Sequence, residues 1–359
     1  MLTPEKLTNI VNNKVVDIYT KLNQQLTNEI IKKINKTGDI TEYTKSQIRV
    51  LKKNGGKDIF YKSLKQTQNI TNKRKKELEN LFEEIEKEQF EDYKEQYDYR
   101  NIDYKIDGST KQTLDAIIKR TNKELSNMTR SIAFSGEKTY IKAVDDLYTK
   151  VISGGWSYDK AIKSVLLNLT EQGVTLTSNG RQYSLESAVK MNLFTSIKQT
   201  ADEISKQIKN DIKADAVWIA PTPYCRPTHR VINGVVMNLK EFERNYEYLT
   251  EEPNCYHVIN YVVKDAFEAP LDKSEINKIN KNADKVYKNR QKQNYLARQV
   301  RQKKKEIASI KNSSKEVLKD KKIQLRNAQA KYRIFSKSKG LEVDYSQTWE
   351  AGYNGNSSR

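Results

Sequence analysis

Apolar residues recur every three or four positions through much of this 359-residue chain, a pattern that restricts it to helices with one buried face. The clearest run consists of Leu7, Val11, Val15, Ile18, Leu22, Leu26, Ile30 and Ile34. It predicts one amphipathic helix that begins at Thr3-Pro4-Glu5 and stops at Thr37-Gly38. With 36% hydrophobic and 31% charged residues, the composition favours elongated helical units over one compact globule. We therefore expect a mainly α protein.

The same spacing predicts further helices as far as residue 215. Their expected ranges are 41–51, 58–64, 72–93, 109–128, 138–153, 157–172 and 184–212. Glycine should end three of these helices, because Asn54-Gly55-Gly56 follows the first, Gly154-Gly155 follows the fifth and Gly173 follows the sixth. Before the last helix, Asn179-Gly180 predicts a short hairpin within residues 175–183.

Residues 216–267 differ from the rest, because β-branched and aromatic residues gather there. Residues 216–219 read as a short strand, and Pro221 and Pro223 follow it. Asn233-Gly234 lies between β-branched pairs and predicts a type I′ hairpin over 231–236. Residues 258–263 form a third strand candidate. We expect one small α+β domain.

That stretch contains both cysteines and both histidines of the chain, Cys225, His229, Cys255 and His257. Each close pair precedes a predicted strand, so a small sheet would bring the pairs together. Thiolate and neutral imidazole are ligands that Zn²⁺ takes in tetrahedral sites, so a structural zinc is the candidate cofactor. The spacings, Cys-x3-His and Cys-x-His, differ from those of standard zinc fingers. Two alternatives stay open: a Cys225–Cys255 disulfide, and buried side chains that bind nothing.

The net charge of +19 points to a polyanionic partner. Residues 288–339 contain 18 Lys or Arg against 3 acidic residues, a net +15, whereas residues 77–98 carry a net −8 from 10 acidic and 2 basic residues. Apolar positions in the basic segment predict two antiparallel helices with a bend at Asn312-Ser313-Ser314. The expected seam residues are Tyr295, Leu296, Val300, Ile307 and Ile310 in the first helix and Val317, Leu318, Ile323, Leu325 and Ala328 in the second.

A basic helical hairpin of this charge favours contact with the nucleic acid backbone, independent of base sequence and sensitive to salt. A solvated charged surface is the alternative. The residues expected to lie near DNA are Arg298, Arg301, Lys303, Lys304, Lys305, Lys319, Lys321, Lys322 and Arg326.

Taken together, the patterns divide the chain into a helical unit (1–96), a central helical domain (109–215), the α+β domain (216–273), the basic hairpin (274–339) and a tail (340–359). No apolar run approaches the roughly 20 residues that cross a bilayer, and the N-terminus has no signal-peptide core. We expect synthesis and residence in cytosol, with reduced thiols.

Three short motifs resemble those of a known family. They are Arg226-Pro227-Thr228-His229, Ile232-Asn233-Gly234-Val235-Val236 and Asn254-Cys255-Tyr256-His257. Their order and spacing resemble the tailed-phage minor capsid protein 2 family, related to the head morphogenesis protein F of phage Mu. Arg226, Pro227, Gly234 and Asn254 match that family's motif, whereas Val235 and Tyr256 stand where the family usually has Lys and Arg. Further similarity within residues 124–190 extends the resemblance over nearly the whole chain.

The resemblance implies a structural virion component that is made in the host bacterial cytoplasm and lies inside the head or at the portal vertex. Its implied partners are the portal protein, the major capsid or scaffolding protein, and double-stranded DNA, with no membrane required. Ejection with the genome is left open. Two other classes compete with this hypothesis. A metal-dependent nuclease would use the Cys-His cluster, but the nearest carboxylate downstream of it is Asp265. A nucleic-acid-binding regulator would need a recognition helix, and no such motif occurs. We expect a protein without enzymatic activity.

Overall fold

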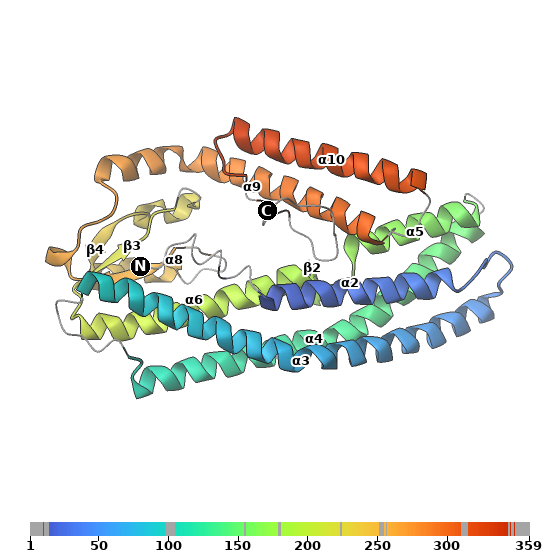
Figure 1. The fold of residues 1–359 in the computed structure, drawn as a ribbon, viewed down its shortest axis with the longest axis horizontal. Coiled ribbons are helices and arrows are strands. Elements are labelled where there is room, and N and C mark those ends of the chain that lie inside the picture. The colour runs from blue at the N-terminus through green and yellow to red at the C-terminus, as the bar shows by residue number, and fades with distance from the viewer. Residues whose placement is uncertain are drawn as a thin grey trace. The chain divides into compact units, whose positions relative to one another are not determined.

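The fold is taken from a computed structural model, which describes residues 10, 14–97, 105–153, 156–178, 181–222, 225–250, 255, 257–309, 315–343, 345 and 348. The chain forms two compact units, each from three separate segments. The first comprises Met1–Val16, Arg74–Leu125 and Val189–Gln291, and the second Asp17–Lys73, Ser126–Ala188 and Lys292–Arg359. Several helices therefore belong to both units (Figure 1). The five consecutive domains expected from the sequence stay a prediction.

Helices dominate the described chain, which confirms the expected mainly α class. Their bounds are α2 (Lys14–Asn35), α3 (Lys45–Tyr97), α4 (Gly108–Ile152), α5 (Tyr158–Gln172), α6 (Leu185–Asp211), α7 (Leu239–Asn245), α8 (Glu247–Thr250), α9 (Lys273–Ser309) and α10 (Lys315–Ser338). The Ser157 side chain accepts a hydrogen bond from the Lys160 amide and caps α5, as its position before the helix predicts. The proposed start of the first helix at Thr3 lies outside the described residues.

The prediction that Gly55-Gly56 ends a helix is wrong, because α3 continues through both glycines. Each glycine instead allows α3 and α4 to approach closely within the second unit. A Cβ at Gly55 would overlap the ring of Tyr140, and one at Gly56 would lie 3.3 Å from side-chain atoms of Glu137 and Ile141. On α4, a Cβ at Gly136 would lie 2.9 Å from the Ser63 hydroxyl oxygen. The sequence also predicted a break between helices 109–128 and 138–153. Helix α4 instead runs without a break through this interval, and Gly136 within it lies at the close contact with α3.

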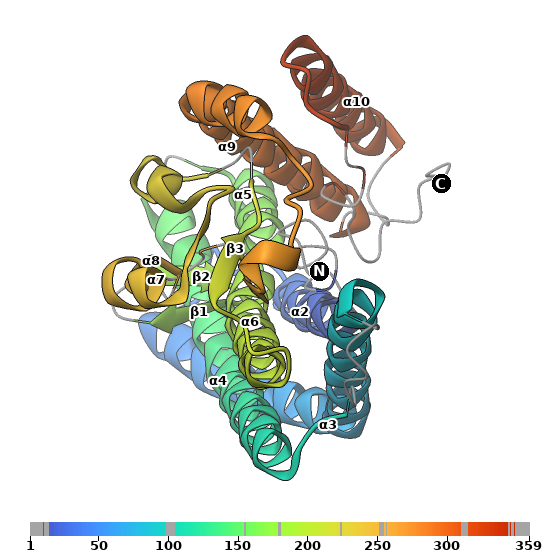
Figure 2. The same cartoon turned by 90° about the vertical axis from the view of Figure 1, so that its left-hand side faces the viewer.

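A three-stranded sheet forms in the first unit from β3 (Ala216–Ile219), β4 (Val236–Asn238) and β5 (Ile259–Val262). The strand order is β4-β3-β5, and both pairings are antiparallel. One face carries Val217, Ile219, Ile259 and Tyr261 into a core completed by Phe242 of α7. Helix α7 packs against β3 and β4 (Figure 2). The expected strands at 216–219 and 258–263 are confirmed.

The hairpin expected over 231–236 is wrong. Residues Pro227–Ile232 form a 3-10 helix, η2, and β4 pairs with β3 instead. Gly234 does adopt the positive φ that the Asn-Gly pair suggested (+78°), and its amide donates to the Ile219 carbonyl. Asn233 departs from the expectation because its side chain is buried and hydrogen-bonded rather than exposed in a turn.

Two tyrosines of α3 cover the outer edge of β5. The Tyr261 amide donates to the Tyr93 hydroxyl (3.1 Å), and the Val263 amide donates to the Tyr97 hydroxyl (3.2 Å). Four helical residues rise about 6 Å, and two strand residues advance about 6.7 Å, so the two spacings match. The rings stack with centroids 6.3 Å apart. The helix thus supplies acceptors that an edge strand otherwise finds only in water or in another strand.

In the second unit, a short hairpin precedes α6. Strands β1 (Thr175–Ser178) and β2 (Arg181–Ser184) pair antiparallel, which confirms the hairpin expected there. The Asn23 side chain of α2 accepts a hydrogen bond from the Val174 amide (2.9 Å) and so fixes the segment between α5 and β1. Among the described residues, no helix is long and apolar enough to cross a bilayer.

Candidate functional site

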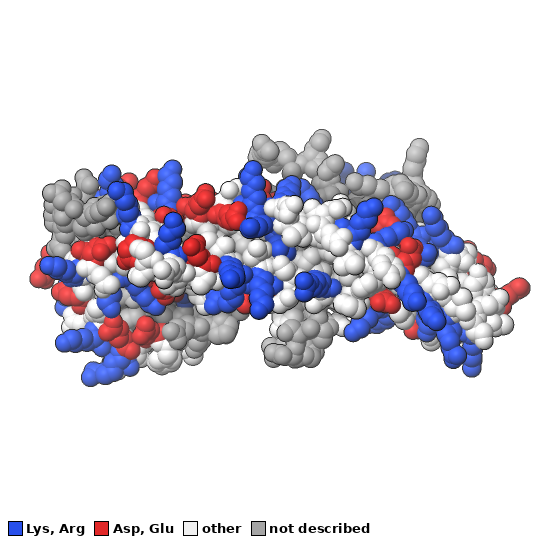
Figure 3. Space-filling view, turned by 90° about the horizontal axis from the view of Figure 1, so that it is seen from below, with Lys and Arg blue, Asp and Glu red and all other residues white. Residues whose placement is uncertain are grey.

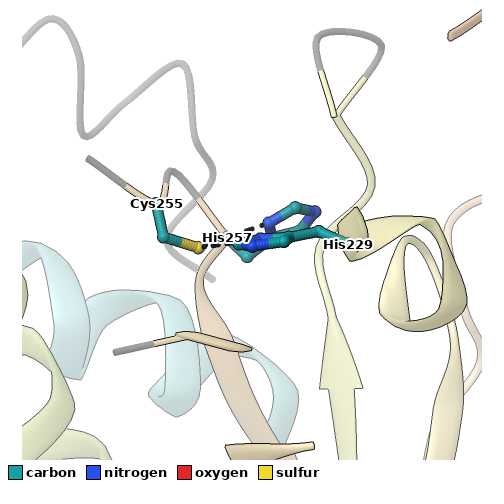
Figure 4. Close-up of side chains that lie close together, drawn as sticks. All are labelled: His229, Cys255 and His257. Atoms are coloured by element: carbon teal, nitrogen blue, oxygen red, sulfur yellow. Dashed lines mark hydrogen bonds between the residues drawn. The ribbon is translucent and has the colours of Figure 1, made fainter. Parts of the chain in front are cut away.

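Three of the four predicted ligand residues meet in the first unit. His229 comes from η2, and Cys255 and His257 come from the segment that leads into β5 (Figure 4). One ligand atom from each residue lies within 4.8 Å of the other two. The Cys255 sulfur is 3.5 Å from the Nδ1 atoms of both histidines. The sheet brings these side chains together as the sequence predicted.

The cluster is enclosed by protein. The side chains of His229, Cys255 and His257 are exposed by only 0%, 2% and 2%. The two imidazole centroids lie 5.4 Å apart. A nuclease centre has to present its metal to a phosphodiester, so this burial speaks against the nuclease hypothesis and suits a structural role.

Asn233 fixes the orientation and the tautomer of His257. Its Oδ1 accepts from the Thr222 amide (2.8 Å), and its Nδ2 donates to the Thr222 carbonyl (3.2 Å) and to Asn280 Oδ1 of α9 (2.8 Å). These partners determine which end of the amide is oxygen. Since His257 Nε2 lies 3.3 Å from that oxygen, Nε2 carries the proton and donates it. The Nδ1 lone pair of His257 therefore faces the Cys255 sulfur.

The surroundings also keep His257 neutral. Burial lowers the pKa of His257 from 6.5 to about 3, and the neighbouring cations Lys198 and Arg226 act in the same direction. An imidazole in this state can accept a proton or a metal at Nδ1.

Cys225 does not belong to the three-residue group. It is a buried free thiol whose sulfur donates to the Arg226 carbonyl (3.2 Å). Burial raises the pKa of Cys225 from 9.0 to about 12, so the thiol stays protonated at neutral pH. Both cysteines are thiols, so the alternative of a Cys225–Cys255 disulfide does not hold in this structure.

The family-motif residues shape the backbone around the cluster. Arg226 precedes η2 with extended backbone, and Pro227 occupies the first turn, where its missing amide proton is not needed. Gly234 has positive φ, and a Cβ there would lie 3.1 Å from Ile276 of α9. Asn254 lies outside the described residues. Sequence reasoning missed Asn233 as a site residue, because an Asn-Gly pair looks the same whether its asparagine faces solvent or the interior.

The basic helical pair, α9 with α10, is the second candidate site. Within the second unit, Ala297, Val300 and Ile307 of α9 pack against Leu325 and Tyr332 of α10. Gln293 Nε2 of α9 donates to Ser336 Oγ of α10 (2.8 Å). The two predicted helices are confirmed.

Two expected seam residues do not take part as predicted. Tyr295 and Ile323 are both 45% exposed. Ile310 and the side chain of Val317 lie outside the described part of the chain. Tyr332 of α10 also joins the seam.

The nine residues expected to lie near DNA fall into two groups. Arg298, Lys319, Lys322 and Arg326 are exposed. The others have partners within the protein: Arg301 and Lys305 contact Glu186, Lys303 and Lys321 contact Glu306, and Lys304 donates to the Thr348 carbonyl. Their proximity to DNA stays a prediction.

Exposed basic residues of α10 recur at helical spacing and form what we call the basic stripe. The stripe consists of Lys319, Lys322, Arg326, Arg333 and Lys337. At 100° per residue, these five positions fall within a sector of about 60°, over a length of about 27 Å. Asp320, an exposed acid of α10, lies about 100° from the stripe. By comparison, the face of the molecule in Figure 3 intersperses Lys and Arg with Asp and Glu.

Comparison with known proteins supplies the context for both sites. A family model described as phage minor capsid protein 2 matches residues 2–337. Comparisons with curated proteins and with solved structures gave no match. Because the family match covers nearly the whole chain, including the Cys-His cluster and both basic helices, the protein belongs to the phage minor capsid protein 2 family.

Proposed function

We propose that this structural protein of the phage head lies inside the capsid or at the portal vertex, where the basic stripe contacts packaged double-stranded DNA. Family membership supports the role in the head. The stripe is the observation that carries the DNA contact, since its five cations follow one exposed face of α10. The portal protein and the major capsid or scaffolding protein are the proposed protein partners.

The chemistry of the stripe fits phosphates rather than bases. Lys and Arg neutralise phosphate charge and release condensed counterions, and this contribution does not depend on base sequence. Between residues 319 and 337, no carboxylate lies on the same face of α10 as the five cations. A row of cations about 27 Å long can follow the DNA backbone past several phosphates. Binding should therefore be nonspecific and should weaken steeply with salt.

A salt titration tests the DNA contact. The full chain is mixed with random-sequence duplex DNA, and the association constant is measured over a series of salt concentrations. The logarithm of that constant should fall by about 0.9 per neutralised phosphate for each unit of log salt concentration. Changing all five stripe residues to Gln should reduce the slope by about 4 to 5.

A charge-matched variant separates the stripe from net charge. The control changes five exposed lysines of α3 to Gln: Lys45, Lys53, Lys57, Lys65 and Lys73. It removes the same charge, and its salt slope should stay close to that of the unmodified chain. Equal losses in both variants would contradict the assignment to α10, as would an unchanged slope in the stripe variant.

A further inference from the structure

We propose that His229 Nδ1, Cys255 Sγ and His257 Nδ1 bind one Zn²⁺, which ties η2 to the start of β5. The two histidines and the thiol come from parts of the chain that the sheet brings together, as Figure 4 shows. A metal bridge at this position closes a loop of 26 residues between His229 and Cys255. The inference concerns the small sheet and does not depend on the role proposed for the basic stripe.

The distances suit a tetrahedral zinc ion. Zinc bonds of about 2.3 Å to sulfur and 2.0–2.1 Å to nitrogen, at a tetrahedral angle, place sulfur and nitrogen about 3.6 Å apart. The Cys255 sulfur lies 3.5 Å from the Nδ1 of His229 and 3.5 Å from the Nδ1 of His257. Both distances match, and one possible ligand atom from each of the three residues lies within 4.8 Å of the other two. A small rotation of the imidazoles would complete the coordination.

The hydrogen bonds around the cluster prepare His257 for a metal. A ligating imidazole normally donates its other ring N–H to a fixed acceptor, which sets its tautomer. Asn233 Oδ1 is such an acceptor, 3.3 Å from His257 Nε2. It is itself fixed by the Thr222 backbone and by Asn280. The lone pair of His257 Nδ1 thus faces the site before any ion binds.

Hydrogen bonding without a metal is the competing explanation for the same contacts. The Cys255 S–H can donate to His257 Nδ1, and His229 Nδ1–H can donate to the sulfur. Zinc binding releases the Cys255 thiol proton, whereas the proton on His229 Nδ1 moves to Nε2, so both imidazoles bind the metal in the neutral form. Because Cys225 already donates to the Arg226 carbonyl, we assign the fourth coordination position to a water molecule rather than to Cys225.

Metal content tests the proposal directly. The full chain is produced with added zinc, dialysed, and analysed for bound zinc by mass spectrometry. We expect one zinc per chain in the unmodified protein, loss of that zinc in Cys255→Ser, and one zinc per chain in Cys225→Ser. The two variants make the same chemical change at the chain's two buried cysteines, so Cys225→Ser is a matched control.

A spectroscopic measurement on the unmodified chain keeps the test decisive if Cys255→Ser fails to fold. X-ray absorption of the zinc-loaded protein should show one sulfur and two imidazole nitrogens around the ion. Cobalt bound in place of zinc should show a thiolate charge-transfer band. A chain without zinc, a second sulfur ligand, or loss of zinc in Cys225→Ser would each overturn the three-residue site.

Discussion

The hydroxyl groups of Tyr93 and Tyr97 accept hydrogen bonds from backbone amides that would otherwise need a neighbouring strand. Both side chains are fully buried, and each hydroxyl accepts one outward amide of the β5 edge. Burial raises the pKa of Tyr93, which keeps its hydroxyl neutral. Since α3 contributes both residues one turn apart, the helix and the strand are held in a defined register.

Tyr93→Phe and Tyr97→Phe should each destabilise the chain by about 1–3 kcal/mol, because each removes the acceptor of a backbone amide that is buried at Tyr261 and part-buried at Val263. Denaturant unfolding measures the loss. Tyr248→Phe is the control, since the Tyr248 side chain is 63% exposed and its change should have little effect. Equal stabilities in all three variants would show that the hydroxyls do not stabilise the edge.

Asn233→Ala should weaken zinc binding about 10- to 100-fold, because it removes the acceptor that orients His257. Competition with a chromophoric chelator measures the affinity. With saturating cobalt, the thiolate band should still appear, since all three ligands remain. Loss of the band at saturation would mean that Asn233 holds the fold rather than positioning His257.

At the residue scale, sequence reasoning identified the chemistry but not its arrangement. His229, Cys255 and His257 stood out as rare residues in close pairs, and they do meet. Cys225 stood out equally, yet its thiol donates a hydrogen bond to the carbonyl of the next residue, Arg226. Asn233 gave no signal, because its role depends on contacts with Thr222 and Asn280, one of which is far along the chain.

At the scale of elements, the apolar spacing predicted the helices well, whereas the prediction that Gly55-Gly56 ends a helix was wrong. The spacing reads the buried face directly, whereas the effect of a glycine depends on what lies beside it. Gly55 lies against Tyr140 of α4, a neighbour that no local pattern shows. The same limit applies to α10, where basic residues at helical spacing were countable, but Arg333 and Lys337 were left out of the expected DNA-proximal set.

Gly55→Ala should destabilise the chain by about 1–3 kcal/mol, because the added methyl group overlaps the Tyr140 ring at the α3–α4 contact. Thermal or denaturant unfolding provides the measurement. In Gly108→Ala the new methyl group meets no atom within 4 Å, so that variant should be neutral or slightly stabilising. If Gly55→Ala were also stabilising, the close approach would be refuted.

Glu306 joins α9 to α10 and should make their pairing sensitive to acid. Burial alone would raise the pKa of Glu306, but hydrogen bonds from Lys303 (2.5 Å) and Lys321 (2.6 Å) outweigh it, so the pKa lies below the ordinary 4.5. Because the carboxyl pKa is lower in the folded chain, the ionised Glu306 stabilises the fold fully at pH values above 4.5. That contribution is lost as the pH falls through the folded-state value.

Glu306→Gln therefore provides a pH test. The difference in unfolding free energy between the unmodified chain and Glu306→Gln should be largest near neutral pH and should shrink below about pH 4.5. Denaturant titrations over this pH range measure it. A difference that stays constant across the range would exclude the ionised carboxylate as the cause.

At the scale of the whole molecule, charge is distributed unevenly along the chain. Residues 288–339 hold a net +15 of the total +19. If this segment contacts packaged DNA, the protein should be present at low copy number in DNA-filled heads. Mass spectrometry of purified particles, before and after DNA release, measures this. Depletion after release would show ejection with the genome, and retention would favour a fixed place at the portal.

Absence from both filled and emptied particles would contradict the proposed location. A prohead sample collected during assembly provides the comparison in that case. Detection only in proheads would indicate an assembly factor that departs before maturation.

The interleaving of the two units bears on how the chain is made. The first unit takes segments that end at Gln291, and the second takes segments from Asp17 to Arg359. Domains of a nascent chain usually fold one after another as they leave the ribosome. Here neither unit has all its segments until more than three-quarters of the chain has been translated. The part of the apolar surface of α2 to α6 that the later segments cover therefore stays exposed until those segments have been translated.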